Sequence, residues 1–141
     1  MGYPGIFPTG TTVYNKDKAW NGYTVFPTKK GALLIDMNGN EVKLWAGLEG
    51  FPNKILPGGY VLGSTGSIKS KYSYQDEKDL VQVDWDGNIV WKFDKTELYA
   101  DPGQEPQYFA RQHHDYQREG STVGYYYPGG EPKTDSGNTF I

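Results

Sequence analysis

One pattern of alternating residues occurs twice in this chain, in segments 34–45 and 82–93, and it limits the fold more than any other feature. On both sides of Asp86-Gly87, apolar residues alternate with polar ones. This period of two is typical of β-strands with unequal faces. Asp-Gly between two such runs predicts a hairpin with a type I′ turn, in which both central residues have a positive φ. No window shows an uninterrupted helical spacing of apolar residues, so we expect an all-β protein.

The two segments align around their glycines. Gly39 and Gly87 lie 48 positions apart, and each is followed by an asparagine. A weaker strand–turn–strand pattern follows each hairpin, around Gly59 and around Gly120. A repeat of about 40–50 residues built from short strands is typical of β-propeller blades. One blade cannot bury both of its faces, so it must stack on neighbouring blades.

The predicted strands make about two and a half to three blades of four strands. A closed propeller needs about four blades or more, so we expect a partial propeller that further residues or another chain complete. The chain stops at Phe140-Ile141, which resembles the opening of a strand and favours the same interpretation. The expected strands are 22–26, 32–37, 41–45, 51–56, 60–64, 79–85, 88–93, 113–118, 122–127 and 138–141.

The predicted organisation has two parts. Residues 1–19 form an extended lead-in, and residues 20–141 form the partial β-propeller domain. Within that domain the blade repeat lies near 22–64 and 79–127, with an inserted loop at 94–112.

Composition excludes several classes of protein. The absence of cysteine excludes disulfides and thiolate zinc sites. A net charge of −3 gives no electrostatic signature for a nucleic-acid partner. No run of about 18 apolar residues predicts a membrane segment, and the N-terminal residues do not resemble a signal peptide. No phosphate-binding loop or catalytic triad stands out, so we expect no cofactor.

A metal site is also not expected. Asp84, Asp86 and Asn88 alternate around Gly87 and bear a faint similarity to a calcium-binding loop. The glycine comes too early and no glutamate closes the loop. A hairpin turn accounts for all four residues.

Four stretches taken in order resemble the bacterial arylsulfotransferase family. They are Ala19–Phe26, Leu34–Asn40, Val83–Trp91 and Arg111–Asp115, the last with the sequence Arg-Gln-His-His-Asp. The resemblance covers most of residues 9–141. It implies a six-bladed propeller and a periplasmic or secreted location. It also implies transfer of a sulfuryl group from a phenolic sulfate ester to a phenol through a sulfated histidine, without a nucleotide donor.

The resemblance also assigns candidate site residues. It implies that His113 and His114 are accessory catalytic residues that stabilise the transferring anionic group. The family's nucleophilic histidine lies in a later blade, and nothing in this chain matches it. Arg111 has the geometry to bind a sulfate through two hydrogen bonds, and Asp115 to orient an imidazole. The expected ligands are a small aromatic sulfate and a phenol.

The residues alone leave other interpretations open. His113 and His114 on one strand point to opposite faces, so at most one faces a given site. Arg111 is also compatible with an ordinary surface charge, and Asp115 with a strand-edge carboxylate. Two alternative functions therefore remain. One is a non-catalytic, propeller-like interaction or structural module, and the other is a self-associating half-propeller.

Overall fold

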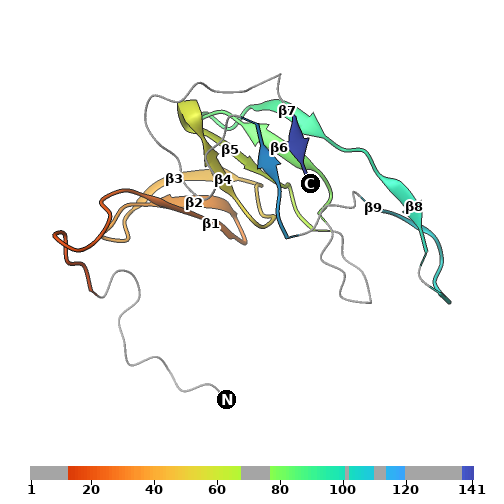
Figure 1. The fold of residues 1–141 in the computed structure, drawn as a ribbon, viewed down its shortest axis with the longest axis horizontal. Helices are drawn as coiled ribbons and strands as arrows, with labels where there is room; N and C mark the ends of the chain where they lie inside the picture. Colours follow the sequence, from red (N-terminus) through yellow and green to blue (C-terminus); the bar gives the residue numbers. More distant parts are fainter. Residues whose placement is uncertain (1–12, 68–76, 101, 110–113, 120–137) are drawn as a thin grey trace, which may run out of the picture.

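The computed structural model describes residues 13–67, 77–100, 102–109, 114–119 and 138–141 (Figure 1). Within these ranges the protein is all-β, with four antiparallel sheets and one short 3₁₀ turn. No helix there has the length and apolar character that crossing a membrane requires. The strands are β1 (Thr24–Thr28), β2 (Gly31–Ile35), β3 (Glu41–Ala46), β4 (Lys54–Leu56), β5 (Tyr60–Gly63), β6 (Leu80–Val83), β7 (Ile89–Phe93), β8 (Glu97–Tyr99), β9 (Gln107–Phe109), β10 (Gln117–Arg118) and β11 (Thr139–Phe140).

The first sheet has the order β1-β2-β3 and buries one of its two faces. Ala32, Leu34 and Trp45 point toward the second sheet and belong to one apolar cluster. Residues of the opposite parity, such as Phe26 and Leu44, are more exposed. The sequence alternation therefore produces the expected unequal faces.

The second sheet is a four-stranded meander, β4-β5-β6-β7, and it is covered on both faces. Val61, Val81 and Val83 pack against the first sheet. Leu62 and Leu80 point the other way, into a second apolar cluster. All four residues of β6 are buried, since that strand has a neighbouring sheet on each side.

The β10–β11 ladder covers the second face. Its contribution to the second apolar cluster is Tyr116, which directly precedes β10. The second sheet thus lies between the β1–β3 sheet and the β10–β11 ladder. The β8–β9 hairpin lies away from both, at the opposite end of the ribbon from β1–β3 (Figure 1).

The two predicted hairpins are present, but the type I′ turn is wrong. Gly39 and Gly87 have φ values of 82° and 94°, and neither preceding residue has a positive φ. Each loop is a four-residue turn in which the glycine N–H donates to the carbonyl of Asp36 or Asp84, at 3.0 and 3.1 Å. A β-bulge lies next to each loop, where the strand register shifts. The bulge accommodates the extra residues of the longer turn.

The same aspartates hold both loops. The side-chain amide of Asn40 donates to Asp36, and that of Asn88 to Asp84, at 2.9 Å in each case. These hydrogen bonds are the first cause of the lowered pKa of each aspartate. They stabilise the ionised carboxylate. Asn88 is therefore engaged in closing the hairpin, as the hairpin interpretation expected.

The other strand predictions have mixed outcomes. The unit around Gly59 is confirmed, since a 3₁₀ turn at Pro57–Gly59 joins β4 to β5. The segment 94–112, predicted as a loop, contains the β8–β9 hairpin. Of the strand predicted at 113–118, the described residues form a strand only at 117–118, because His114 has a left-handed backbone with a φ of 67°; residue 113 lies outside the described part of the chain. The strand predicted at 122–127 lies outside the described residues.

Candidate functional site

Two of the four predicted site residues belong to the described part of the chain. Arg111 and His113 lie outside it. His114 is exposed and occupies a left-handed turn, and Asp115 follows it directly. A non-glycine residue with a positive φ is uncommon, and such residues concentrate at turns and functional sites.

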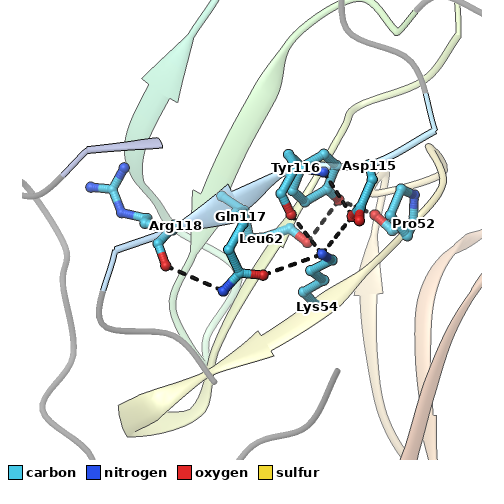
Figure 2. A network of polar contacts seen from close by, with 7 residues as sticks. All are labelled: Pro52, Lys54, Leu62, Asp115, Tyr116, Gln117 and Arg118. Atoms are coloured by element: carbon cyan, nitrogen blue, oxygen red, sulfur yellow. Dashed lines mark hydrogen bonds and ion pairs between the residues drawn. The ribbon is translucent and has the colours of Figure 1, made fainter. Parts of the chain in front are cut away.

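Lys54 links this turn to the second sheet through an ion pair and hydrogen bonds (Figure 2). Its ammonium group forms an ion pair with Asp115 at 2.5 Å. It also donates to the backbone carbonyl of Tyr116 at 2.6 Å, and it lies 3.5 Å from the side-chain oxygen of Gln117. The ammonium is 5.5 Å from the centre of the Tyr116 ring, within cation–π range. One lysine of β4 therefore contacts Asp115 and the two residues that follow it, Tyr116 and Gln117.

Tyr116 is the buried anchor beside this lysine. Its hydroxyl donates to the carbonyls of Pro52 and Leu62, the second at 3.2 Å (Figure 2). Burial of the phenol, followed by the nearby charges of Glu77 and Asp115, raises the pKa of Tyr116. The phenol therefore stays protonated and acts as a hydrogen-bond donor rather than as a base.

Asp115 is held in its ionised form. The hydrogen bond from Lys54 is the first cause of its lowered pKa, and the backbone N–H of Tyr116, which donates at 2.8 Å, also contributes. Its side chain is 74% exposed, so this ion pair belongs to the surface. The carboxylate contacts Lys54 and a backbone amide, and those contacts fix where it points.

Buried polar groups continue from Tyr116 into the second sheet. The Arg118 guanidinium lies 4.2 Å above the Trp91 ring and donates to the Thr139 hydroxyl at 2.9 Å. Gln82 pairs with Trp91 across β6 and β7. Gln82 is fully buried, and neither atom of its side-chain amide has a hydrogen-bond partner among the described residues. The face of the second sheet that packs Leu62 and Leu80 therefore also holds buried polar side chains.

A separate polar cluster lies just after the end of β5 and just before the start of β6. Asp79 accepts from the backbone N–H and the hydroxyl of Thr65, both at 2.8 Å, and from Ser64 at 3.3 Å. Glu77 accepts from the backbone N–H of Phe51 at 3.2 Å. Most of these donors are backbone or hydroxyl groups, which is typical of a structural loop. In the described part of the chain, no three His, Cys, Asp or Glu side chains gather as a metal site would require.

Sequence reasoning missed the residues that organise this region. Lys54, Tyr116 and Arg118 stand in or beside predicted strands and form no motif with one another. Lys54 and Tyr116 are 62 positions apart, and their contact depends on how the sheets stack. The one signal in the sequence was the position of Tyr116 immediately after the His-His-Asp motif.

Comparisons with known proteins add no relative. No protein-family model matches the chain. Searches of curated proteins and of solved structures likewise give no match. The function must therefore be argued from the residues and their geometry.

Proposed function

We propose that this chain provides blades of an arylsulfotransferase-like β-propeller, in which the Arg111–Asp115 segment contributes accessory groups for sulfuryl transfer. The observation that carries the proposal is the fixed position of the turn at His114. His114, exposed on a left-handed backbone, directly precedes two residues that Lys54 and the Tyr116 hydroxyl fix to the second sheet. Catalytic groups need such fixed positions, because a donor that moves loses much of its effect on a transition state.

The stacked sheets are compatible with propeller blades. The second sheet is a four-stranded antiparallel meander with a neighbouring sheet on each face, as a blade requires. The hairpin loops at Asp36–Asn40 and Asp84–Asn88 have the same hydrogen bonds, which supports a repeating unit. A six-bladed ring would need further sheets, from a continued chain or from a second one.

The proposed chemistry balances without a cofactor. In the arylsulfotransferase family, the bond between sulfur and the donor's phenolic oxygen breaks, and the donor leaves as a phenolate. The sulfuryl group bonds to an imidazole nitrogen and then passes to the oxygen of the acceptor phenol, which loses its proton. Here Arg111, His113 and His114 would stabilise the sulfuryl oxygens, as cationic and hydrogen-bonding donors do. The nucleophilic imidazole would come from another blade.

The direct test is binding and turnover of 4-nitrophenyl sulfate. We expect the chain to bind the ester and the His114 imidazole resonances to shift on titration. His114→Asn is the informative variant, because asparagine tolerates a left-handed backbone better than alanine does. It should weaken ester binding by about ten-fold, the loss of one good hydrogen bond to an anion. Asp86→Asn, an exposed change in the β6–β7 loop, is the matched control.

Two outcomes would count against this function. One is the absence of any ester-dependent shift at His114 at millimolar ester. The other is equal binding by the wild-type chain and by His114→Asn. Nitrophenol release with a phenol acceptor, measured with further blades present, extends the same test to catalysis.

One observation favours a non-catalytic module as the second candidate. The Asp115 carboxylate contacts Lys54 and a backbone N–H, the contacts of a structural turn. If the His-His-Asp segment only closes that turn, the propeller-like sheets would serve protein interaction. That candidate predicts that Lys54→Met lowers stability while the chain binds no sulfate ester.

A further inference from the structure

The chain contains two Asn-Gly dipeptides, Asn21-Gly22 and Asn38-Gly39, and their surroundings differ. In this dipeptide the backbone nitrogen of the glycine can attack the asparagine side-chain amide, because glycine has no side chain to obstruct the approach. The attack requires the asparagine backbone and side chain to rotate until the nitrogen meets Cγ. In a folded protein, the hydrogen bonds around the dipeptide therefore set how readily the reaction occurs.

The Asn38-Gly39 dipeptide lies in the β2–β3 loop and is fixed by Asp36. The Gly39 N–H, whose nitrogen would be the nucleophile, donates to the Asp36 carbonyl at 3.0 Å. The Asp36 carboxylate accepts from the backbone N–H groups of Asn38 and Asn40, at 2.8 and 2.9 Å. The side-chain amide of Asn40 donates to the same carboxylate at 2.9 Å. Rotation of Asn38 into the reactive geometry would break several of these hydrogen bonds together.

The Asn21-Gly22 dipeptide lies before β1 and has few restraints. Asn21 is exposed. Its side-chain oxygen accepts a hydrogen bond from the Tyr14 hydroxyl at 3.3 Å, which leaves the amide carbon open to attack. Among the residues that the structure describes, the Gly22 N–H has no hydrogen-bond partner. Rotation of Asn21 therefore costs at most one long hydrogen bond at the surface.

We propose that Asn21 is a site of spontaneous deamidation in the folded chain, and that the Asp36 loop protects Asn38. The Gly22 nitrogen loses its proton to hydroxide and bonds to Cγ of Asn21. The Cγ–Nδ2 bond then breaks, and the nitrogen leaves as ammonia. Water opens the resulting succinimide at either of its two ring C–N bonds, which gives aspartate or isoaspartate. The inference does not use the proposed function.

The modification changes both charge and backbone at the entry to β1. It adds one negative charge to a chain whose net charge is −3. Isoaspartate also routes the backbone through the side-chain carbonyl, which lengthens it by one carbon atom. Since Asn21 lies shortly before Thr24, where β1 begins, the added atom changes how the preceding residues approach that strand.

The second hairpin loop separates protection from poor fit of the product. Asp86 occupies the position in the Asp84–Asn88 loop that Asn38 occupies in the first loop. Both loops have the same hydrogen bonds to their first aspartate. A carboxylate therefore fits that position, so the protection expected at Asn38 concerns the rate of ring closure.

The first experiment incubates the folded chain in mildly alkaline buffer, beside an equal sample in urea, until the urea sample has deamidated. Trypsin places the two dipeptides on different peptides, since Lys29 and Lys30 lie between them. Mass spectrometry then follows each conversion. We expect similar rates at both sites in urea. In the folded chain, Asn21 should convert at least about ten-fold faster than Asn38, the ratio that one or two hydrogen bonds protect.

Two results of that experiment would overturn the proposal. One is conversion at Asn38 as fast as at Asn21 in the folded chain. The other is a folded chain in which neither site converts while the urea sample does.

Gly22→Ala tests the nucleophile. A Cβ added at Gly22 would lie 3.5 Å from the Trp20 ring, an ordinary contact, and Gly22 has no positive φ, so the variant should fold. Its methyl group obstructs the backbone nitrogen. Conversion at Asn21 should slow by about ten-fold or more, since a small displacement of a reacting atom has effects of that size. The rate at Asn38 is the internal control. An unchanged rate at Asn21 would rule out the ring closure that we propose.

Asp36→Ala tests the protection. It removes the acceptor that fixes the first loop, so conversion at Asn38 should rise toward its rate in urea while Asn21 is unchanged. Asp84→Ala, the same change in the β6–β7 loop, is the matched control and should leave both rates unchanged. Circular dichroism melts verify folding, and Asp36→Asn, which keeps one acceptor oxygen, replaces a variant that does not fold. An unchanged rate at Asn38 overturns the assignment of protection to Asp36.

Discussion

The two faces of the β4–β7 sheet are packed by different means. Toward β1–β3, the buried contacts are mainly between apolar side chains, with Val61, Val81 and Val83 against Leu34 and Trp45. One hydrogen bond also links the two sheets here, from the Trp45 indole N–H to the Asp84 carbonyl, at 2.9 Å. The opposite face holds the β10–β11 ladder with buried and partly buried polar groups as well. Those groups are Lys54, Gln82, Tyr116 and Arg118.

This difference has a physical consequence. Apolar packing is tolerant of direction, and its strength scales with buried area. Hydrogen-bonded polar groups fix a position, but they cost stability wherever one lacks a partner. The polar face is therefore suited to holding one turn in one geometry. The candidate residues His114 and Asp115 lie at the edge of that face.

The largest expected effect is on the apolar face. Leu34→Ala should lower the free energy of unfolding by about 2–5 kcal/mol, through lost transfer energy and the cavity left behind. Urea denaturation measures it. Ile89→Ala, an exposed residue of β7, should cost no more than about 0.5 kcal/mol. Equal losses for the two variants would show that the face toward β1–β3 is not a packed core.

On the polar face, the Tyr116 hydroxyl is the group to remove. Tyr116→Phe leaves the carbonyls of Pro52 and Leu62 without their donor, at a cost of about 1–3 kcal/mol. Relative to the wild-type chain, amide hydrogen exchange in Tyr116→Phe should accelerate more at β10 than at β6, since the hydroxyl links the β10–β11 ladder to the second sheet. Tyr23→Phe, in which the ring is exposed, is the control. Uniform acceleration across all strands would contradict a local anchor.

Replacing Gln82 should change stability in the opposite direction. Gln82→Met keeps a side chain of similar length and removes an amide that is buried without a partner among the described residues. We expect a gain of about 1 kcal/mol in the free energy of unfolding. Leu62→Met, on the paired residue of β5, controls for repacking. A loss of stability in Gln82→Met would mean that the amide is satisfied in the folded protein.

The smallest effect concerns pH. Lys54 holds the pKa of Asp115 below its unfolded value of about 3.9. The ion pair thus contributes stability above that pH, and the contribution is lost as pH falls through the lower folded pKa. Since Asp115 is 74% exposed, solvent screening limits it to about 0.2–1 kcal/mol.

The measurement is acid unfolding of the wild-type chain and of Asp115→Asn. We expect the two stability curves to differ above pH 4 and to converge in strong acid. Asp86→Asn, an exposed change in the β6–β7 loop, is the control, and its stability curve should match that of the wild-type chain. Curves that stay parallel from pH 7 to pH 2 would contradict the ion pair.

Local pattern was a good guide to strands and a poorer guide to turns. The alternation at 81–83 and 89–93 correctly predicted the β6–β7 hairpin. The Asp-Gly dipeptide predicted the wrong turn type, because the Asp84 side chain caps the loop and only Gly87 needs a positive φ. The segment 94–112 was predicted as a loop on its polar composition, yet β8 and β9 pair there.

The candidate site was predictable only in part. The His-His-Asp motif marked the segment, but its position just before β10 did not reveal the left-handed backbone at His114. Nor could it reveal Lys54, which reaches Asp115 from a strand about sixty positions earlier. A long-range ion pair has no periodicity, so no local pattern encodes it.

The sequence by itself determined the all-β character of the described residues, the positions of the hairpins around Gly39 and Gly87, and the residue alternation of β6 and β7. These follow from residue alternation and turn chemistry, which act over a few positions. Only the tertiary structure decided that the second sheet is covered on both sides and that Lys54 and Tyr116 hold the His114 turn. Those outcomes depend on how sheets stack, and stacking is set by contacts between residues far apart in the chain.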